Sequence, residues 1–202
     1  MPRTVGFDLD LTLIDARPGM IALIDQLSEE TGVPLDAAFF AANLGPPVEV
    51  LLRGAGAPEA AIPALADRYR ALYPAIVLPT TVPMPGAREA LAAVRARGAR
   101  IVVVTGKHQP NAAKHLRAFG WEVDDLVGGL WAEGKAIALR EHDAEIYVGD
   151  HVGDMHGARA AGAIAVGVAT GPCTEAELRA AGAEFVLADL TGFADWLTVS
   201  AR

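Results

Sequence analysis

The sequence predicts an α/β fold, a three-layer doubly wound parallel sheet with a small all-helical cap inserted after the first strand. Short apolar runs alternate with helical segments through most of the chain, as in parallel sheets covered by helices. One stretch, from about residue 18 to 79, has helical periodicity alone. Three apolar runs end in polar residues, and ligands bind at the carboxyl edge of such sheets.

The core strands are short runs rich in Val, Ile and Leu. They are predicted at 4–9, 100–105, 123–127, 146–149 and 163–168. The segments 185–187 and 193–199 finish the alternating pattern of strands and helices. The helices between them mostly end at a glycine, the residue that favours the left-handed conformation after a helix. They are predicted at 85–97, 111–119, 134–142, 155–161 and 174–181.

Residues 17–79 form the predicted cap. The helix candidates within it are 18–30, 34–43, 47–53 and 58–73. A helical insert directly after the first strand is expected to cover the carboxyl edge of the sheet. The chain is therefore divided into a core of residues 1–16 and 80–202 and a cap of residues 17–79.

Composition indicates a globular protein of the cytoplasm. The chain has 202 residues, 52% of them hydrophobic, yet no apolar run is long enough to span a bilayer, and the N-terminus lacks a signal-peptide pattern. The single cysteine, Cys173, excludes an intrachain disulfide and is interpreted as an inert thiol. The net charge of −8 argues against nucleic acid as a partner. We expect a small-molecule partner, no membrane, and a monomer or homodimer.

Asp8 and Asp10 lie at the end of the first strand and in the turn that follows. One carboxylate can attack phosphorus to give an aspartyl-phosphate, while the second protonates the leaving oxygen. Taken alone, the pair is explained better as a turn or helix-cap pair. Asp150 follows another strand, and with Asp8 it supplies the oxygen ligands that Mg²⁺ prefers. Asp154 suits either that site or a helix N-cap.

The remaining polar groups suit a phosphate. Thr105 offers a hydroxyl at a strand end, and Gly106 allows backbone N–H groups to approach a ligand. Lys135, at a predicted helix start, is interpreted as the cation that holds phosphoryl oxygens. Lys107 is assigned to solvent, because Thr105-Gly106-Lys107 lacks the upstream glycine of a P-loop.

In their order and residue types these motifs resemble those of haloacid dehalogenase superfamily phosphohydrolases, in the phosphoglycolate-phosphatase-like branch. The matching positions are Asp8-Leu9-Asp10-Leu11-Thr12, Thr105, Lys135, and Gly149-Asp150 with Asp154. The resemblance covers essentially the whole chain and includes the helical insert. The family often has Gly at the position of Leu11 and Asn at that of Gly106, departures that leave the substrate preference open.

The resemblance implies a Mg²⁺-dependent phosphatase acting on a small soluble phosphate monoester. Asp8 would be the nucleophile and Asp10 the acid/base, with its backbone carbonyl on the metal. Thr105 and Lys135 would hold phosphate, Asp150 would bind the metal, and Asp154 would bind it or orient its waters. A phosphosugar mutase of the same superfamily remains an alternative. A phospho-accepting receiver domain fits less well, because it needs only about half of this chain.

Specificity is expected to come from the cap. Arg17, at the hinge, can meet a substrate carboxylate or be an ordinary solvated arginine. The loop Gly45-Pro46-Pro47 resembles the family's cap loop that faces the active site, although proline also simply starts helices. Arg53 is interpreted as solvated. His151 is a candidate to support the metal site from outside its ligands.

Overall fold

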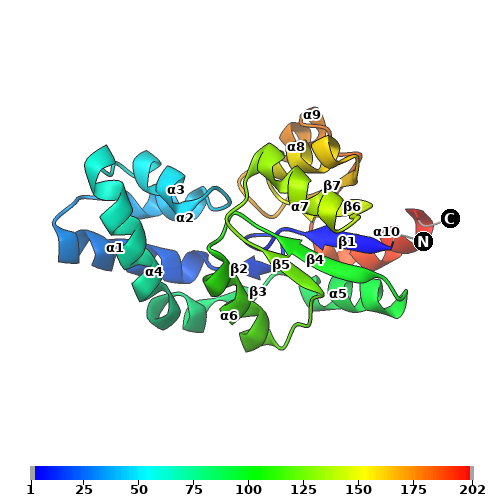
Figure 1. Cartoon of the computed structure of the whole chain (residues 1–202), viewed down its shortest axis with the longest axis horizontal. Helices are drawn as coiled ribbons and strands as arrows, with labels where there is room; N and C mark the ends of the chain where they lie inside the picture. Colours follow the sequence, from blue (N-terminus) through cyan, green and yellow to red (C-terminus); the bar gives the residue numbers. More distant parts are fainter. Residues whose placement is uncertain (1–2, 201–202) are drawn as a thin grey trace.

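A six-stranded parallel sheet forms the centre of the computed structural model, which describes residues 3–200 (Figure 1). In spatial order its strands are β5 (Asp125–Val127), β4 (Arg100–Val104), β1 (Thr4–Phe7), β6 (Ile146–Gly149), β7 (Ile164–Val168) and β8 (Phe185–Leu187). Chain order runs outward from β1 in both directions, so the sheet is doubly wound and its topological switch point lies beside β1. The predicted fold class is confirmed.

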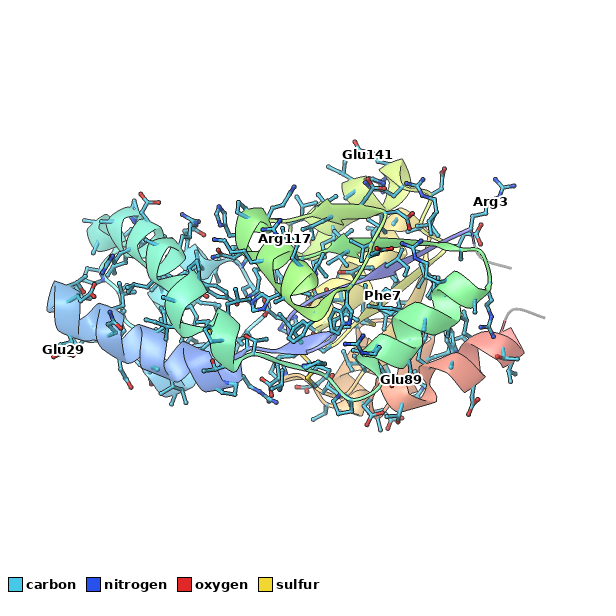
Figure 2. All side chains as sticks on the ribbon, turned by 90° about the horizontal axis from the view of Figure 1, so that it is seen from below. Arg3, Phe7, Glu29, Glu89, Arg117 and Glu141 are labelled. Atoms are coloured by element: carbon cyan, nitrogen blue, oxygen red, sulfur yellow. The ribbon has the colours of Figure 1, made fainter. Side chains whose placement is uncertain are left out.

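Helices cover both faces of the sheet. One layer contains α5 (Ala87–Ala96), α6 (Gln109–Phe119) and α10 (Phe193–Ser200), and the other contains α7 (Lys135–Glu141), α8 (Val152–Ala161) and α9 (Glu175–Ala180). Because strand side chains alternate between faces, Ile101 and Val103 of β4 join the first core cluster, whereas Val102 joins the second. Figure 2 shows Phe7 in the interior, between the sheet and the first helical layer. Glu89 and the other labelled charged side chains lie at the surface.

The strand register aligns the ends of the central strands. Phe7 of β1 pairs with Val103 of β4 and with Val148 of β6. The residues that follow these strands therefore emerge at one edge of the sheet. None of the helices within residues 3–200 is long and apolar enough to cross a bilayer.

The cap helices bury a hydrophobic cluster of their own and lie beside the sheet at the left of Figure 1. They are α1 (Arg17–Thr31), α2 (Ala37–Ala42), α3 (Val48–Gly54) and α4 (Ile62–Ile76). The two chain crossings between core and cap pair as a short antiparallel sheet of β2 (Ile14–Asp15) and β3 (Val82–Pro83), which the sequence analysis did not predict. The domain boundaries at residues 17 and 79 stay a prediction, and residues 1, 2, 201 and 202 lie outside the described part.

Several predicted boundaries were wrong; for example, α8 begins at Val152 rather than at residue 155, and α4 begins at Ile62 rather than at residue 58. The first strand ends at Phe7 rather than Leu9, because a turn follows in which the backbone N–H groups of Leu13 and Ile14 both donate to the Leu9 carbonyl. The last cap helix runs to Ile76 with Pro74 inside it, although the sequence prediction stopped it before that proline. Leu11, where the family often has Gly, has a φ of 58°, the left-handed conformation that glycine adopts at least cost.

Candidate active site

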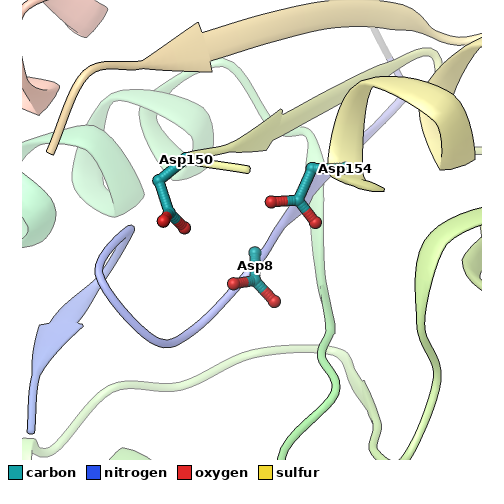
Figure 3. A group of neighbouring side chains, drawn as sticks. All are labelled: Asp8, Asp150 and Asp154. Atoms are coloured by element: carbon teal, nitrogen blue, oxygen red, sulfur yellow. The ribbon is translucent and has the colours of Figure 1, made fainter. Parts of the chain in front are cut away.

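Four side chains from separate parts of the chain meet at the carboxyl edge of the sheet. Asp8 follows β1, Asp150 follows β6, Asp154 lies in the first turn of α8, and Lys135 is the first residue of α7. All four are buried, with exposed fractions between 0% and 2%. Figure 3 shows Asp8, Asp150 and Asp154 side by side, and one carboxylate oxygen of each lies within 4.8 Å of the others. The register of β1 and β6 explains how residues more than 140 positions apart come together.

Lys135 is the centre of the charge network. Its Nζ donates to Asp8 Oδ1 at 2.8 Å, to Asp154 Oδ1 at 2.6 Å and to the Tyr147 hydroxyl at 2.9 Å. Burial by itself would lower the pKa of Lys135, but the carboxylates of Asp154 and Asp8 outweigh it and raise the pKa well above its ordinary value. The ammonium group therefore stays charged, and it neutralises only part of the negative charge around it.

Tyr147 belongs to this network, although the sequence analysis did not identify it. It occupies the middle of β6, where its hydroxyl donates to the Val104 carbonyl at 2.5 Å while accepting from Lys135. A tyrosine inside an apolar strand needs a polar partner for its hydroxyl. This requirement is the feature of the sequence that could have identified Tyr147. Its position fixes the ammonium group beside Asp8.

The carboxyl groups of Asp8 and Asp150 are poorly stabilised as anions by the protein alone. Burial, followed by the neighbouring Asp154 and Asp10 carboxylates, raises the pKa of Asp8 to about 7 against the opposing effect of Lys135. Burial, Asp154 and Asp8 likewise raise the pKa of Asp150 well above its usual range. A divalent cation among these groups would favour their ionised forms.

The residues present fit a hard divalent cation. Asp8, Asp150 and Asp154 each offer a carboxylate oxygen, and these oxygens lie within 4.8 Å of one another. Asp150 Oδ1 accepts from the Thr12 hydroxyl at 3.0 Å, but its buried Oδ2 has no hydrogen-bond partner among residues 3–200. An unpartnered buried carboxylate oxygen beside two further carboxylates suits a metal ligand.

Gly171 lets the chain run close to this cluster. A β-carbon at that position would lie 1.7 Å from Asp150 Oδ2, so any larger residue would displace the carboxyl group or the loop. Neither Gly171 nor Thr12 was singled out for a role from the sequence, because their contacts with Asp150 are set by the fold. Asp154, considered as an N-cap, is instead the third residue of α8, and its Oδ2 accepts from the His151 backbone.

Asp10 lies apart from the three clustered carboxylates. Its Oδ2 forms an ion pair with Lys107 Nζ at 2.8 Å, and the two side chains are 7% and 5% exposed. Lys107 also lies over the ring of Tyr73, a cap residue, at 4.8 Å from its centre. The assignment of Lys107 to solvent was therefore wrong, because the cap covers it. The metal contact predicted for the Asp10 carbonyl stays a prediction.

A cavity of about 340 Å³ separates the cap from the core on the Asp10 side of the site. Core residues Asp10 and Lys107 line it together with cap residues that include Leu44, Arg70 and Tyr73. Such a space at a domain interface is typical of small-molecule sites. The site thus has two parts, the buried charge cluster and this cavity.

The cap loop Gly45-Pro46-Pro47 also lines the cavity and lies directly over the core. A β-carbon on Gly106 would be 2.3 Å from the Gly45 carbonyl oxygen, so a side chain such as Asn has no room there with the cap in this position. Thr105 is buried at the end of β4, and its hydroxyl accepts from the Lys107 backbone at 3.2 Å.

The side chains of the other singled-out residues lie outside the two parts of the site, although the His151 backbone contacts Asp154. The Arg17 guanidinium group donates two hydrogen bonds to Asp15, at 2.9 and 2.7 Å, and Arg17 is not among the residues that line the cavity. Arg53 is exposed and paired with Glu59. His151 caps α8 by accepting from the Gly153 backbone, and its ring contacts Trp131. The substrate contact predicted for Arg17 stays a prediction.

Among known proteins, the phosphoglycolate phosphatase of Rhodospirillum rubrum is 33% identical, over 98% of this chain and 91% of its own length. The tyrosine-protein kinase PtkA of Mycobacterium tuberculosis is 32% identical over 80% of this chain, and the match spans about 60% of that longer protein. A structure described as a predicted phosphatase from Clostridium acetobutylicum superposes with a TM-score of 0.85. It is 21% identical, with 98% of this chain and 99% of that chain covered, and so shows the shared fold.

The family model of haloacid dehalogenase-like hydrolases matches residues 5–168. This segment begins in β1, includes the whole helical cap, and ends with β7. It contains the strand ends that carry Asp8, Thr105 and Asp150, and it also contains Lys135. The fold, the order of these residues and the sequence match agree, and the chain belongs to the haloacid dehalogenase-like hydrolase family.

Proposed function

We propose that this protein hydrolyses a small phosphate monoester with the help of Mg²⁺, through an aspartyl-phosphate formed on Asp8. The observation that carries the proposal is the buried contact of Asp8 with Lys135, within a cluster of carboxylates that fits a divalent cation. Relatives named phosphoglycolate phosphatase, 31% to 33% identical to this chain, support the same activity.

In the first step a carboxylate oxygen of Asp8 forms a bond to phosphorus while the bond from phosphorus to the ester oxygen breaks. Asp10 gives its carboxyl proton to that oxygen, and the alcohol leaves. Lys135 and the Thr105 hydroxyl donate hydrogen bonds to the phosphoryl oxygens. The step needs Asp10 protonated and Asp8 ionised.

In the second step water attacks the phosphorus of the aspartyl-phosphate. Asp10, now a carboxylate, accepts a proton from the water, and the bond between phosphorus and the Asp8 oxygen breaks. Inorganic phosphate leaves, and both aspartates return to their starting forms. The same residue is acid in one step and base in the next.

Asp8, Asp150 and Asp154 are the residues that would hold the metal. When bound, Mg²⁺ supplies positive charge that lets an anionic carboxylate approach an anionic phosphate. Thr12 positions the Asp150 carboxyl group for this role through its hydrogen bond.

The cavity beside Asp10 is where the alcohol part of the ester would lie. Its volume of about 340 Å³ and its mixed lining suit a small polar molecule. The substrate is proposed only as a class, an ester resembling phosphoglycolate, and the cytoplasm remains the expected location.

The test is release of inorganic phosphate from a panel of phosphorylated metabolites and from p-nitrophenyl phosphate. We expect turnover in Mg²⁺, its loss in EDTA, and its return when excess Mg²⁺ is added. Full activity in chelator would remove the metal from the proposal. Isomerised sugar phosphate without free phosphate would indicate the mutase instead, and labelled phosphate transferred from ATP to a protein tyrosine would indicate a kinase.

Arg17→Ala provides a separate prediction about specificity. If Arg17 leaves Asp15 to meet a substrate carboxylate, the variant should raise KM for 2-phosphoglycolate by about tenfold and leave KM for an uncharged ester unchanged. Arg53→Ala is the matched control, because Arg53 has the same two-bond pairing with Glu59 on the exposed surface of the cap. An equal change for all esters would reject the role.

A further inference from the structure

Lys107 contacts both the core and the cap, and it has no role in the reaction steps described above. Its Nζ lies 2.8 Å from Asp10 Oδ2 and 4.8 Å from the ring centre of Tyr73. Lys107 follows β4 of the core, whereas Tyr73 belongs to α4 of the cap. One nearly buried ammonium group therefore links the Asp10 carboxyl group to a cap side chain.

The ring of Tyr73 is itself fixed against the core. Its hydroxyl lies 2.8 Å from His115 Nε2 on α6, and the two rings meet edge to face with centres 5.6 Å apart. Both side chains are buried, at 1% and 0% exposed. Burial, with a smaller contribution from Lys107, lowers the pKa of His115 to about 3, so the imidazole is neutral at ordinary pH. The ring is thus held in place without adding a second cation beside Lys107.

The carboxyl group of Asp10 is held on one side only. Oδ2 forms the ion pair with Lys107, while the buried Oδ1 has no hydrogen-bond partner among residues 3–200. Asp10, Lys107 and Tyr73 all line the cavity in which the alcohol part of the ester would lie. Lys107 therefore holds Oδ2 of Asp10 in place, and Oδ1 is left to contact a molecule bound in the cavity.

We propose that Lys107 is a positioning residue that, together with the Tyr73 ring, holds the Asp10 carboxyl group where it protonates the leaving oxygen. The inference rests on the proposed phosphatase activity. The proton passes from Asp10 to the ester oxygen as its bond to phosphorus breaks, and Lys107 keeps its own protons. Because Tyr73 belongs to the cap, the acid step then depends on the cap lying over the core.

Turnover of two aromatic esters of similar size, p-nitrophenyl phosphate and benzyl phosphate, distinguishes this positioning role from a merely structural one. p-Nitrophenolate leaves as a stable anion with little need of an acid, whereas the alkoxide of benzyl phosphate must be protonated. We expect Lys107→Met to lower kcat for benzyl phosphate by about 30-fold or more but for p-nitrophenyl phosphate by only about threefold. KM should change little for either ester.

Variants on the cap side and at Asp10 complete the experiment. Tyr73→Leu should show the same selective loss, whereas Tyr73→Phe keeps the ring and should stay near the wild-type ratio of the two kcat values. Lys107→Arg keeps the cation and should restore part of the benzyl phosphate turnover. Adding Lys107→Met to Asp10→Asn should cause no further loss for benzyl phosphate, because both changes remove the same acid step.

Circular dichroism and urea unfolding establish that each variant is folded, and Lys107→Gln replaces Lys107→Met if the latter is not. Equal losses for the two esters in folded variants, or additive losses in the double variant, would overturn the positioning role. A wild-type protein that hydrolyses neither ester would instead contradict the proposed function, so the two failures are distinguishable.

Discussion

Asp8→Asn is expected to abolish phosphate release, with kcat falling by about four orders of magnitude or more, because the amide cannot form the aspartyl-phosphate. The substitution keeps the size of the side chain and removes a buried carboxyl group. Burial raises the pKa of that carboxyl group to about 7, so its charge contributes little to stability. The fold should therefore survive. Turnover of p-nitrophenyl phosphate in Mg²⁺ measures the activity, and urea unfolding measures the stability.

Asp25→Asn is the matched control, since it makes the same chemical change at an exposed position on α1. It should leave both turnover and unfolding unchanged. Near-wild-type turnover in Asp8→Asn would mean that another group attacks phosphorus. Covalent labelling offers an independent reading, because denatured wild-type protein quenched during turnover should carry phosphate on Asp8 and the variant should carry none.

Lys135→Met should produce the largest loss of stability. Its ammonium group is fully buried between Asp8 and Asp154, and removing it leaves two buried carboxyl groups without their cation. Breaking a buried ion pair from one side typically costs about 3–5 kcal/mol. We expect the free energy of unfolding, measured by urea denaturation in EDTA at pH 8, to fall by about that amount, and turnover to disappear.

Two further variants test the cause of this loss. Lys114→Met removes a lysine from the partly exposed face of α6 and should change the free energy of unfolding by less than about 0.5 kcal/mol. Adding Asp8→Asn to Lys135→Met should recover part of the stability, because one uncompensated charge is removed. A drop of under about 1 kcal/mol for Lys135→Met would show that the carboxyl groups do not depend on this cation.

The layers of the fold could be predicted from the sequence, because local patterns indicate which segments form strands and which form helices. Runs such as Ile101 to Val104 indicate a buried strand, and a glycine such as Gly120 marks the end of a helix. Parallel strands with a common direction place their following residues at one edge, which is why Asp8 and Asp150 were expected to meet before any distance was known.

Other features depended on contacts between distant segments, which no local pattern encodes. The β2–β3 pair joins Ile14 to Pro83, and each strand has only two residues, too few to show a strand pattern in the sequence. Lys107 carries no sign of burial in its neighbours, since the cap side chain of Tyr73 covers it from 34 positions away. The Arg17 guanidinium contacts Asp15, a neighbour in sequence, and only the fold shows that it does not line the cavity.

By itself the sequence determined the fold class, the helical insert and the set of polar groups at the strand ends, because hydrophobic periodicity and the alternation of strands with helices are visible locally. The tertiary structure decided which carboxylate oxygens lie close together, which lysine contacts which aspartate, and that the Tyr147 hydroxyl completes the Lys135 network. Burial and electrostatic contact depend on every segment that packs around a group. They are therefore settled only when the sheet and the cap are assembled.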